Sequence, residues 1–167
     1  MKLGYFVAAA VLLTPIPFAG MAQPAAALEE THVVVLKGNL RVISCCGFLG
    51  MGNGDETFPF WKQVGLTRSN QRAYLEITGC AGGEARGILE FRLRLNDSDK
   101  LFVRPTLLLY EGASCNSDDK DAEVYPYPTE VAANSGATVW EIGVFNNEFR
   151  SLDEVWANFT ATHSLWP

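Results

Sequence analysis

The sequence predicts an all-β protein, an antiparallel β-sandwich or jelly roll that forms a single domain. Apolar and charged residues alternate from Leu89 to Leu95, which is the period-two pattern of a half-buried strand. Turns rich in Gly and Pro separate about five to eight short apolar stretches. No stretch shows the apolar spacing of a long amphipathic helix. Together these features are typical of two packed sheets.

The N-terminal residues have the features of a signal peptide. Lys2 precedes the apolar run from Leu3 to Leu13, and Gly20 and Ala22 are small residues of the kind found at a cleavage site. The run is shorter than the roughly 20 apolar residues that a membrane helix needs, so no membrane span is expected after cleavage. The expected division is a signal peptide over 1–22, a linker over 23–30 and a β-sandwich domain over 31–167, in a secreted or periplasmic protein.

The expected strands follow from β-branched and alternating apolar residues. The first stretch is either one bent strand, which we favour slightly, or a hairpin turning at Gly38-Asn39. Residues 123–128 carry two prolines and belong at a sheet edge or in coil. In chain order, strands are expected at 31–44, 73–78, 89–95, 101–110, 136–146 and 155–164.

Cys45 to Asn70 is expected to be the least regular part of the domain. Four glycines between residues 47 and 54 disfavour helix and strand. Three aromatic residues follow them: Phe58, Phe60 and Trp61. Because large aromatic side chains usually bury most of their area, they are expected to pin this loop to the core rather than to form an exposed platform.

The two central strands are expected to form a hairpin whose inward face builds the core. Asn96 to Lys100 supplies the turn residues. Inward positions follow from the alternation, and a further set comes from the strand over 136–146. The side chains expected to be buried are Leu89, Phe91, Leu93, Val103, Leu107, Leu109, Trp140, Ile142 and Val144.

Four cysteines behind a signal peptide favour disulfide bonds. Zinc is disfavoured because no C-x₂₋₄-C spacing is present. A hairpin turn centred on Ser98 sets Cys80 opposite residue 116, next to Cys115. Adjacent Cα atoms are about 3.8 Å apart, below the usual disulfide range. We therefore expect Cys45 and Cys46 each to bond one of Cys80 and Cys115, gathered at one end of the sandwich. The alternative is a Cys80–Cys115 bond with two thiols.

Two loops contain clustered oxygen-bearing side chains of the kind that bind calcium. About ten residues of strand separate them, roughly 30 Å, so they cannot share one ion. The loop after Cys115 lacks the order of an EF-hand, and solvated turns are the simpler interpretation. Calcium is the one cofactor considered, and its candidate ligands are Asn116, Asp118, Asp119 and Asp121. The other cluster comprises Asn96, Asp97 and Asp99.

The net charge limits the partners. It is −6 for the chain, and removal of Lys2 with the signal peptide gives −6 − 1 = −7. This argues against nucleic acid and anionic membranes. An extracellular protein or a carbohydrate is the expected partner.

Catalytic residues are not recognisable from the sequence pattern. His32 and His163 lie on the first and last expected strands, where histidines are more often exposed or structural. The strand carboxylates, Glu76, Glu90, Glu111 and Glu141, form no assignable catalytic pair. The sequence therefore favours a secreted, non-enzymatic binding or structural module, with calcium-assisted binding at the Cys115 end. The alternative is a small extracellular hydrolase that uses surface carboxylates.

Overall fold

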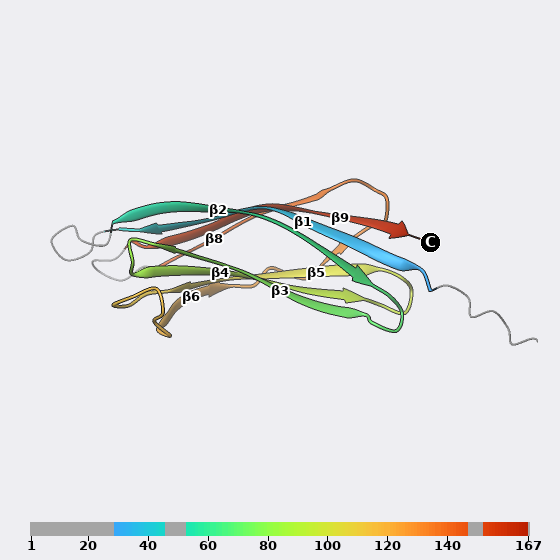
Figure 1. Cartoon of the computed structure of the whole chain (residues 1–167), viewed down its shortest axis with the longest axis horizontal. Helices are drawn as coiled ribbons and strands as arrows, with labels where there is room; N and C mark the ends of the chain where they lie inside the picture. Colours follow the sequence, from blue (N-terminus) through green and yellow to red (C-terminus); the bar gives the residue numbers. More distant parts are fainter. Residues whose placement is uncertain (1–28, 46–52, 147–151, 167) are drawn as a thin grey trace, which may run out of the picture.

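The protein is a β-sandwich in which two antiparallel sheets lie face to face (Figure 1). The computed structural model describes residues 29–45, 53–146 and 152–166. One sheet has the strand order β2-β1-β9-β8, and the other has the order β3-β4-β5-β6, with β7 also paired to β5. The strands are β1 (Thr31–Ser44), β2 (Gly54–Leu66), β3 (Arg72–Ala81), β4 (Ala85–Leu95), β5 (Leu101–Tyr110), β6 (Lys120–Val124), β7 (Thr129–Val131), β8 (Thr138–Phe145) and β9 (Glu154–Trp166). The predicted fold class is confirmed.

β1 is a single strand, so the hairpin at Gly38-Asn39 does not form. It pairs with β9 without interruption, from Thr31 opposite Trp166 to Ile43 opposite Glu154. At Gly38 the two backbones come very close. A Cβ atom there would lie 2.5 Å from the Cβ of Phe159, closer than nonbonded carbons approach. Glycine is therefore needed within the strand itself, not at a turn.

The prediction of an irregular segment is wrong for residues 54–66, which form β2. This strand lies at a sheet edge and pairs along the whole of β1. An edge strand tolerates Pro59, since its missing N–H need not face a neighbour. Phe60 is buried and Phe58 packs against the core, as expected, but Trp61 points outward and is 60% exposed. The glycines from 47 to 52 lie outside the described residues.

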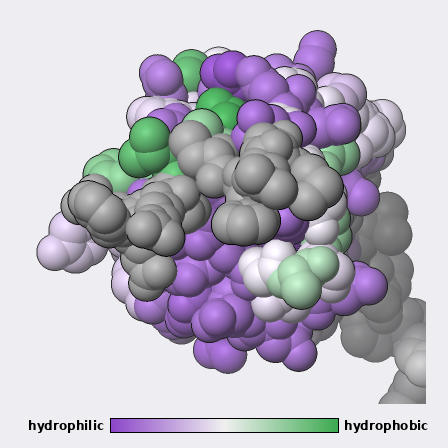
Figure 2. Space-filling view, turned by 90° about the vertical axis from the view of Figure 1, so that its left-hand side faces the viewer, coloured by the Kyte–Doolittle hydropathy of each residue, from purple (hydrophilic) through white to green (hydrophobic). Residues whose placement is uncertain are grey.

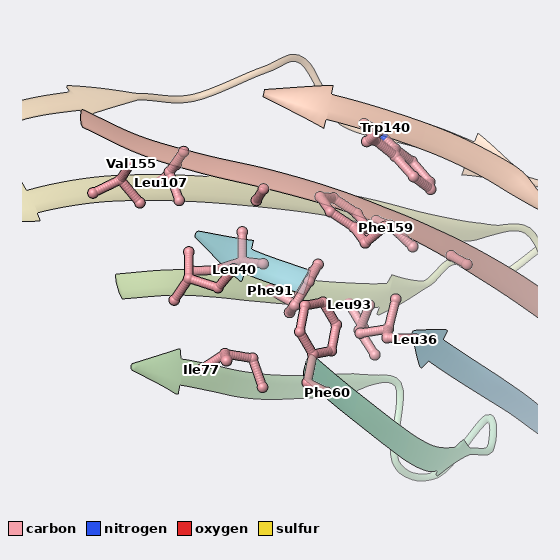
Figure 3. Close-up of a cluster of buried hydrophobic side chains, with 14 of the residues drawn as sticks. Leu36, Leu40, Phe60, Ile77, Phe91, Leu93, Leu107, Trp140, Val155 and Phe159 are labelled. Carbon is pink, nitrogen blue, oxygen red and sulfur yellow. The ribbon is translucent and has the colours of Figure 1, made fainter. Parts of the chain in front are cut away.

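Aromatic residues from both sheets meet at the centre of the core (Figure 3). The ring of Phe91 meets that of Phe159 edge to face, with centroids 4.9 Å apart, and Trp140 stacks on the same Phe159. Phe60 contacts Phe91 from β2. All of the side chains predicted to be in the core are buried, except Ile142, which is partly buried. The alternation in the sequence therefore identified the inward face correctly.

The disulfide links Cys80 to Cys115, with Cα atoms 5.8 Å apart. The predicted pairing of these cysteines with Cys45 and Cys46 is wrong. Cys45 is itself disulfide-bonded, so the alternative in which it is a free thiol is also wrong. Cys46 lies outside the described residues. Cys45, Cys80 and Cys115 do lie at one end of the sandwich, where β1, β3 and β5 end (Figure 1).

The hairpin register predicted around Ser98 is correct, but Cys80 does not lie on the strand to which it applies. β4 and β5 pair as predicted, with Arg86 opposite Tyr110. Cys80, however, belongs to β3, which turns back along β4 and places Cys80 opposite Arg86. Cys115 lies in the loop after β5. Its bond to Cys80 therefore crosses the N-terminal end of β4, which lies between β3 and β5. The bond indicates an oxidising, extracellular-type environment.

Candidate functional site

The loop between β5 and β6 carries the acidic side chains considered as calcium ligands. It lies at the disulfide end, where hydrophilic residues dominate the visible surface outside the grey atoms (Figure 2). Arg86 contacts this loop: its Nη2 donates a hydrogen bond to the Ser117 carbonyl at 2.6 Å and lies 3.7 Å from the Asp118 carboxylate. Its guanidinium also stacks over the Tyr110 ring. Arg86 and the disulfide therefore fix this loop to the sheet.

The four candidate ligands are Asn116, Asp118, Asp119 and Asp121. The Asp118 side chain is fully exposed, and the backbone N–H of Asp119 donates to the Ser117 hydroxyl. Within the described ranges, no three His, Cys, Asp or Glu side chains are close enough together to hold a metal ion. The calcium site stays a prediction.

The second polar cluster, between β4 and β5, is a turn. The Asn96 carboxamide oxygen accepts hydrogen bonds from the backbone N–H groups of Ser98 and Lys100. Asp99 forms a two-pronged ion pair with Arg68, which lowers the pKa of the Asp99 carboxyl. Gln71 donates to Asp97. These contacts account for the cluster as turn chemistry.

The two histidines meet, because β1 and β9 are neighbours. Both are buried, and the Nδ1 of His32 lies 2.9 Å from the Nε2 of His163. The Nδ1–H of His163 donates to the Val131 carbonyl at 2.9 Å, which leaves its Nε2 to accept a hydrogen bond from His32. The Nε2 of His32 lies 3.8 Å from the Asp99 carboxylate. The pair connects both sheets, since Val131 belongs to β7.

This pair predicts a pH-dependent stability. Burial lowers the pKa of His163, helped by the neighbouring His32 and opposed by the hydrogen bond to Val131. A histidine whose folded pKa is depressed favours folding fully above its unfolded pKa of about 6.5, and that stability is lost as the pH falls through the lower folded value. The melting temperature should therefore drop between about pH 7.5 and about pH 5.5. A His163→Gln variant should show a smaller drop; an equal drop in both proteins would contradict this assignment.

Four arginines lie together on the outer face of the second sheet. Strand register places Arg72 of β3 directly opposite Arg94 of β4, and Arg92 of β4 opposite Arg104 of β5. Like charges directly opposite each other on a sheet destabilise the fold. We call this group, Arg72, Arg92, Arg94 and Arg104, the arginine face.

The arginine face borders a hollow of about 650 Å³. Asn96, Phe102 and Pro128 complete its lining. Among the described residues, no carboxylate is within ion-pair distance of Arg72, Arg94 or Arg104, whereas the Nη2 of Arg92 lies 3.6 Å from the Glu90 carboxylate. Three guanidinium groups therefore present unpaired hydrogen-bond donors around one opening. Each of them can bind a carboxylate or a sulfate through two parallel hydrogen bonds.

A carboxylate row borders the arginine face on the same sheet. Glu76 of β3 lies opposite Glu90 of β4. This pair is two residues along each strand from the pair formed by Tyr74 and Arg92. The Tyr74 hydroxyl donates to Glu76 at 3.1 Å, and burial together with Glu90 and Glu76 raises the pKa of Tyr74. Of the four strand carboxylates, the ladder brings these two together. Glu111 instead follows β5 and bonds the side chain of Asn146, and Glu141 lies on the other sheet.

The sequence contained the signal for the arginine face, although we did not predict this site. The hairpin register places Arg92 opposite Arg104 by the same argument that was applied to the cysteines. The sequence favoured the acidic loops instead, because clustered oxygen-bearing side chains are the usual ligands of calcium.

No family model, curated protein or solved structure matches the chain. The parts of the chain that the structure describes contain no helix that is long and apolar enough to cross a membrane.

Proposed function

We propose that the protein is a secreted binding module that holds an anionic glycan on the arginine face. The observation that carries this proposal is the pair of directly opposed arginine couples, Arg72 with Arg94 and Arg92 with Arg104. Of these four side chains, Arg92 has a carboxylate partner, Glu90. The mutual repulsion of the others costs stability, and such departures from local rules are expected at functional sites. An anionic ligand relieves this repulsion when it binds.

The chemistry of the hollow favours a carbohydrate over other anions. The guanidinium groups suit carboxylates or sulfates, while Asn96 offers an amide and Phe102 an apolar surface for the sugar ring. The rest of the protein is acidic, with a net charge of −6 for the chain, so long-range attraction to a highly charged polymer such as DNA is weak. The arginine face therefore recognises its ligand through short-range contacts. The Cys80–Cys115 bond and the signal peptide expected over 1–22 support a role outside the cytoplasm.

The test is calorimetric titration with hexagalacturonate, which carries one carboxylate per sugar. The wild type should bind it. The double variant Arg92→Gln/Arg104→Gln should lose at least about tenfold in affinity for each missing bidentate contact. The reason is that charge-assisted hydrogen bonds contribute about 1.5–3 kcal/mol each. The matched control is Lys37→Gln/Lys62→Gln, which removes two exposed cations from the other sheet and should bind as the wild type does.

Three further measurements complete this test. The arginine variant should melt no lower than the wild type, because its opposed charges are gone. Neutral galactohexaose should not bind at the arginine face. Equal hexagalacturonate affinity in the two double variants, or tighter binding of a single-stranded DNA of equal charge, would contradict the proposal.

Glu76 and Glu90 favour one second candidate, hydrolysis of the same ligand. Two carboxylates that face each other beside a substrate site are the groups that glycoside hydrolases use. Release of new reducing ends from hexagalacturonate, abolished in Glu76→Gln and in Glu90→Gln, would identify a hydrolase. Binding without release supports the binding module.

A further inference from the structure

The outer face of the other sheet carries a flat aromatic ring that is fixed from below. Trp156 of β9 lies opposite Gly143 of β8, and a Cβ atom at Gly143 would lie 2.5 Å from the Trp156 ring. The indole therefore rests directly on the glycine backbone. Its Nε1–H donates a hydrogen bond to Glu154 at 2.8 Å, which orients the ring. The side chain is nevertheless 40% exposed, so its upper face is available to a ligand.

Polar side chains on the neighbouring row form the wall of a hollow of about 360 Å³ beside this ring. Asn158 of β9 lies between Asn39 of β1 and Glu141 of β8 in the strand register. The Asn39 side-chain NH₂ donates to the Asn158 carboxamide oxygen at 3.2 Å. This bond leaves the Asn39 oxygen and the Asn158 NH₂ group to meet a ligand. Among the described residues, no hydrogen bond or ion pair engages Glu141.

We infer that this hollow binds a neutral sugar, whose ring stacks on Trp156 while Asn39, Asn158 and Glu141 bond its hydroxyl groups. Sugar C–H groups carry a slight positive charge and are attracted to the electron-rich face of an indole. Hydroxyl groups both donate and accept, so they match an amide oxygen, an amide NH₂ and a carboxylate placed side by side. This inference goes beyond the proposed function, because the hollow lies on the opposite sheet from the arginine face.

The local charges select against other ligands. Arg41 lines the hollow, but it is already engaged with Asp55 through two hydrogen bonds of 2.8 and 2.6 Å. The uncommitted charge is thus the Glu141 carboxylate, which disfavours anionic ligands. A quaternary ammonium ion prefers a cage of several aromatic rings, whereas Trp156 is the single aromatic side chain in the described lining.

The experiment is titration of intrinsic tryptophan fluorescence with three neutral hexaoses: cellohexaose, mannohexaose and chitohexaose. The protein is produced in a host that does not glycosylate Asn158, which begins an Asn-Phe-Thr sequon. At least one hexaose should change the fluorescence saturably. Trp156→Ala should weaken its binding about tenfold or more, the equivalent of about 1.4 kcal/mol, as measured by calorimetry. Trp156→Phe should restore part of the loss by returning a flat ring.

Trp61→Ala is the matched control, because Trp61 is an exposed tryptophan on the same face of the same sheet. It should leave binding unchanged. Asn39→Ala removes a hydrogen-bonding group without uncovering Gly143, so it weakens binding even if Trp156→Ala proves unstable. The double variant Arg92→Gln/Arg104→Gln should bind the neutral hexaose normally, which separates this site from the arginine face. Absence of binding for all three hexaoses, equal losses in Trp61→Ala and Trp156→Ala, or binding of choline in place of the sugars would overturn the inference.

Discussion

Leu107→Ala is expected to lower the free energy of unfolding by about 2–5 kcal/mol. Leu107 is fully buried, lies opposite Leu89 on β4 and Val124 on β6, and belongs to the cluster that joins the two sheets (Figure 3). Its truncation removes apolar contacts and leaves a cavity that the paired strands cannot close. Urea titration followed by circular dichroism measures this loss.

Leu152→Ala is the matched control for the core prediction. Leu152 is 59% exposed, so the same truncation should change the free energy of unfolding by no more than about 0.5 kcal/mol. If both variants lost the same amount, the assignment of Leu107 to the interior would be refuted.

Loss of the Cys80–Cys115 bond is expected to lower the free energy of unfolding by about 3–4 kcal/mol. The two cysteines are 35 residues apart, and a closed loop of this size restricts the unfolded chain by about that amount. The bond also ties the loop after β5 to the end of β3. Chemical denaturation of Cys80→Ser, Cys115→Ser and the double variant measures this effect.

The three cysteine variants form a cycle that also tests the pairing. Because either single substitution breaks the same bond, each should destabilise the protein as much as the double variant does. Additive losses would mean that the two cysteines bond different partners, as the sequence had led us to expect.

The fold was largely predictable because local pattern and sheet geometry agree. Alternation from Leu89 to Leu95 and the turn over 96–100 defined the central hairpin and its register, and the observed pairing of Phe91 with Pro105 follows that register. β2 was missed because its evidence is not local. Its glycines and Pro59 disfavour a strand, and the strand forms because β1 offers a complete ladder and the core accepts Phe60.

The candidate sites were harder to predict, because they depend on which strands become neighbours. His32 and His163 are 131 residues apart, and they meet because β9 lies beside β1. Cys80 met Cys115, rather than Cys45 or Cys46, because β3 turns back along β4. The arginine face combines residues from three strands, and it becomes visible when the rows across β3, β4 and β5 are aligned.

The most direct test of the proposed function is a ¹⁵N NMR titration that follows the arginine Nε–H signals while hexagalacturonate is added. Arg72, Arg92, Arg94 and Arg104 should shift together, because their guanidinium groups surround one hollow. The internal controls are Arg41, Arg68 and Arg86, which are already bonded to Asp55, Asp99 and Ser117 and should not shift. Shifts confined to the control arginines, or no shift in any arginine at saturating ligand, would contradict an anionic glycan site on the arginine face.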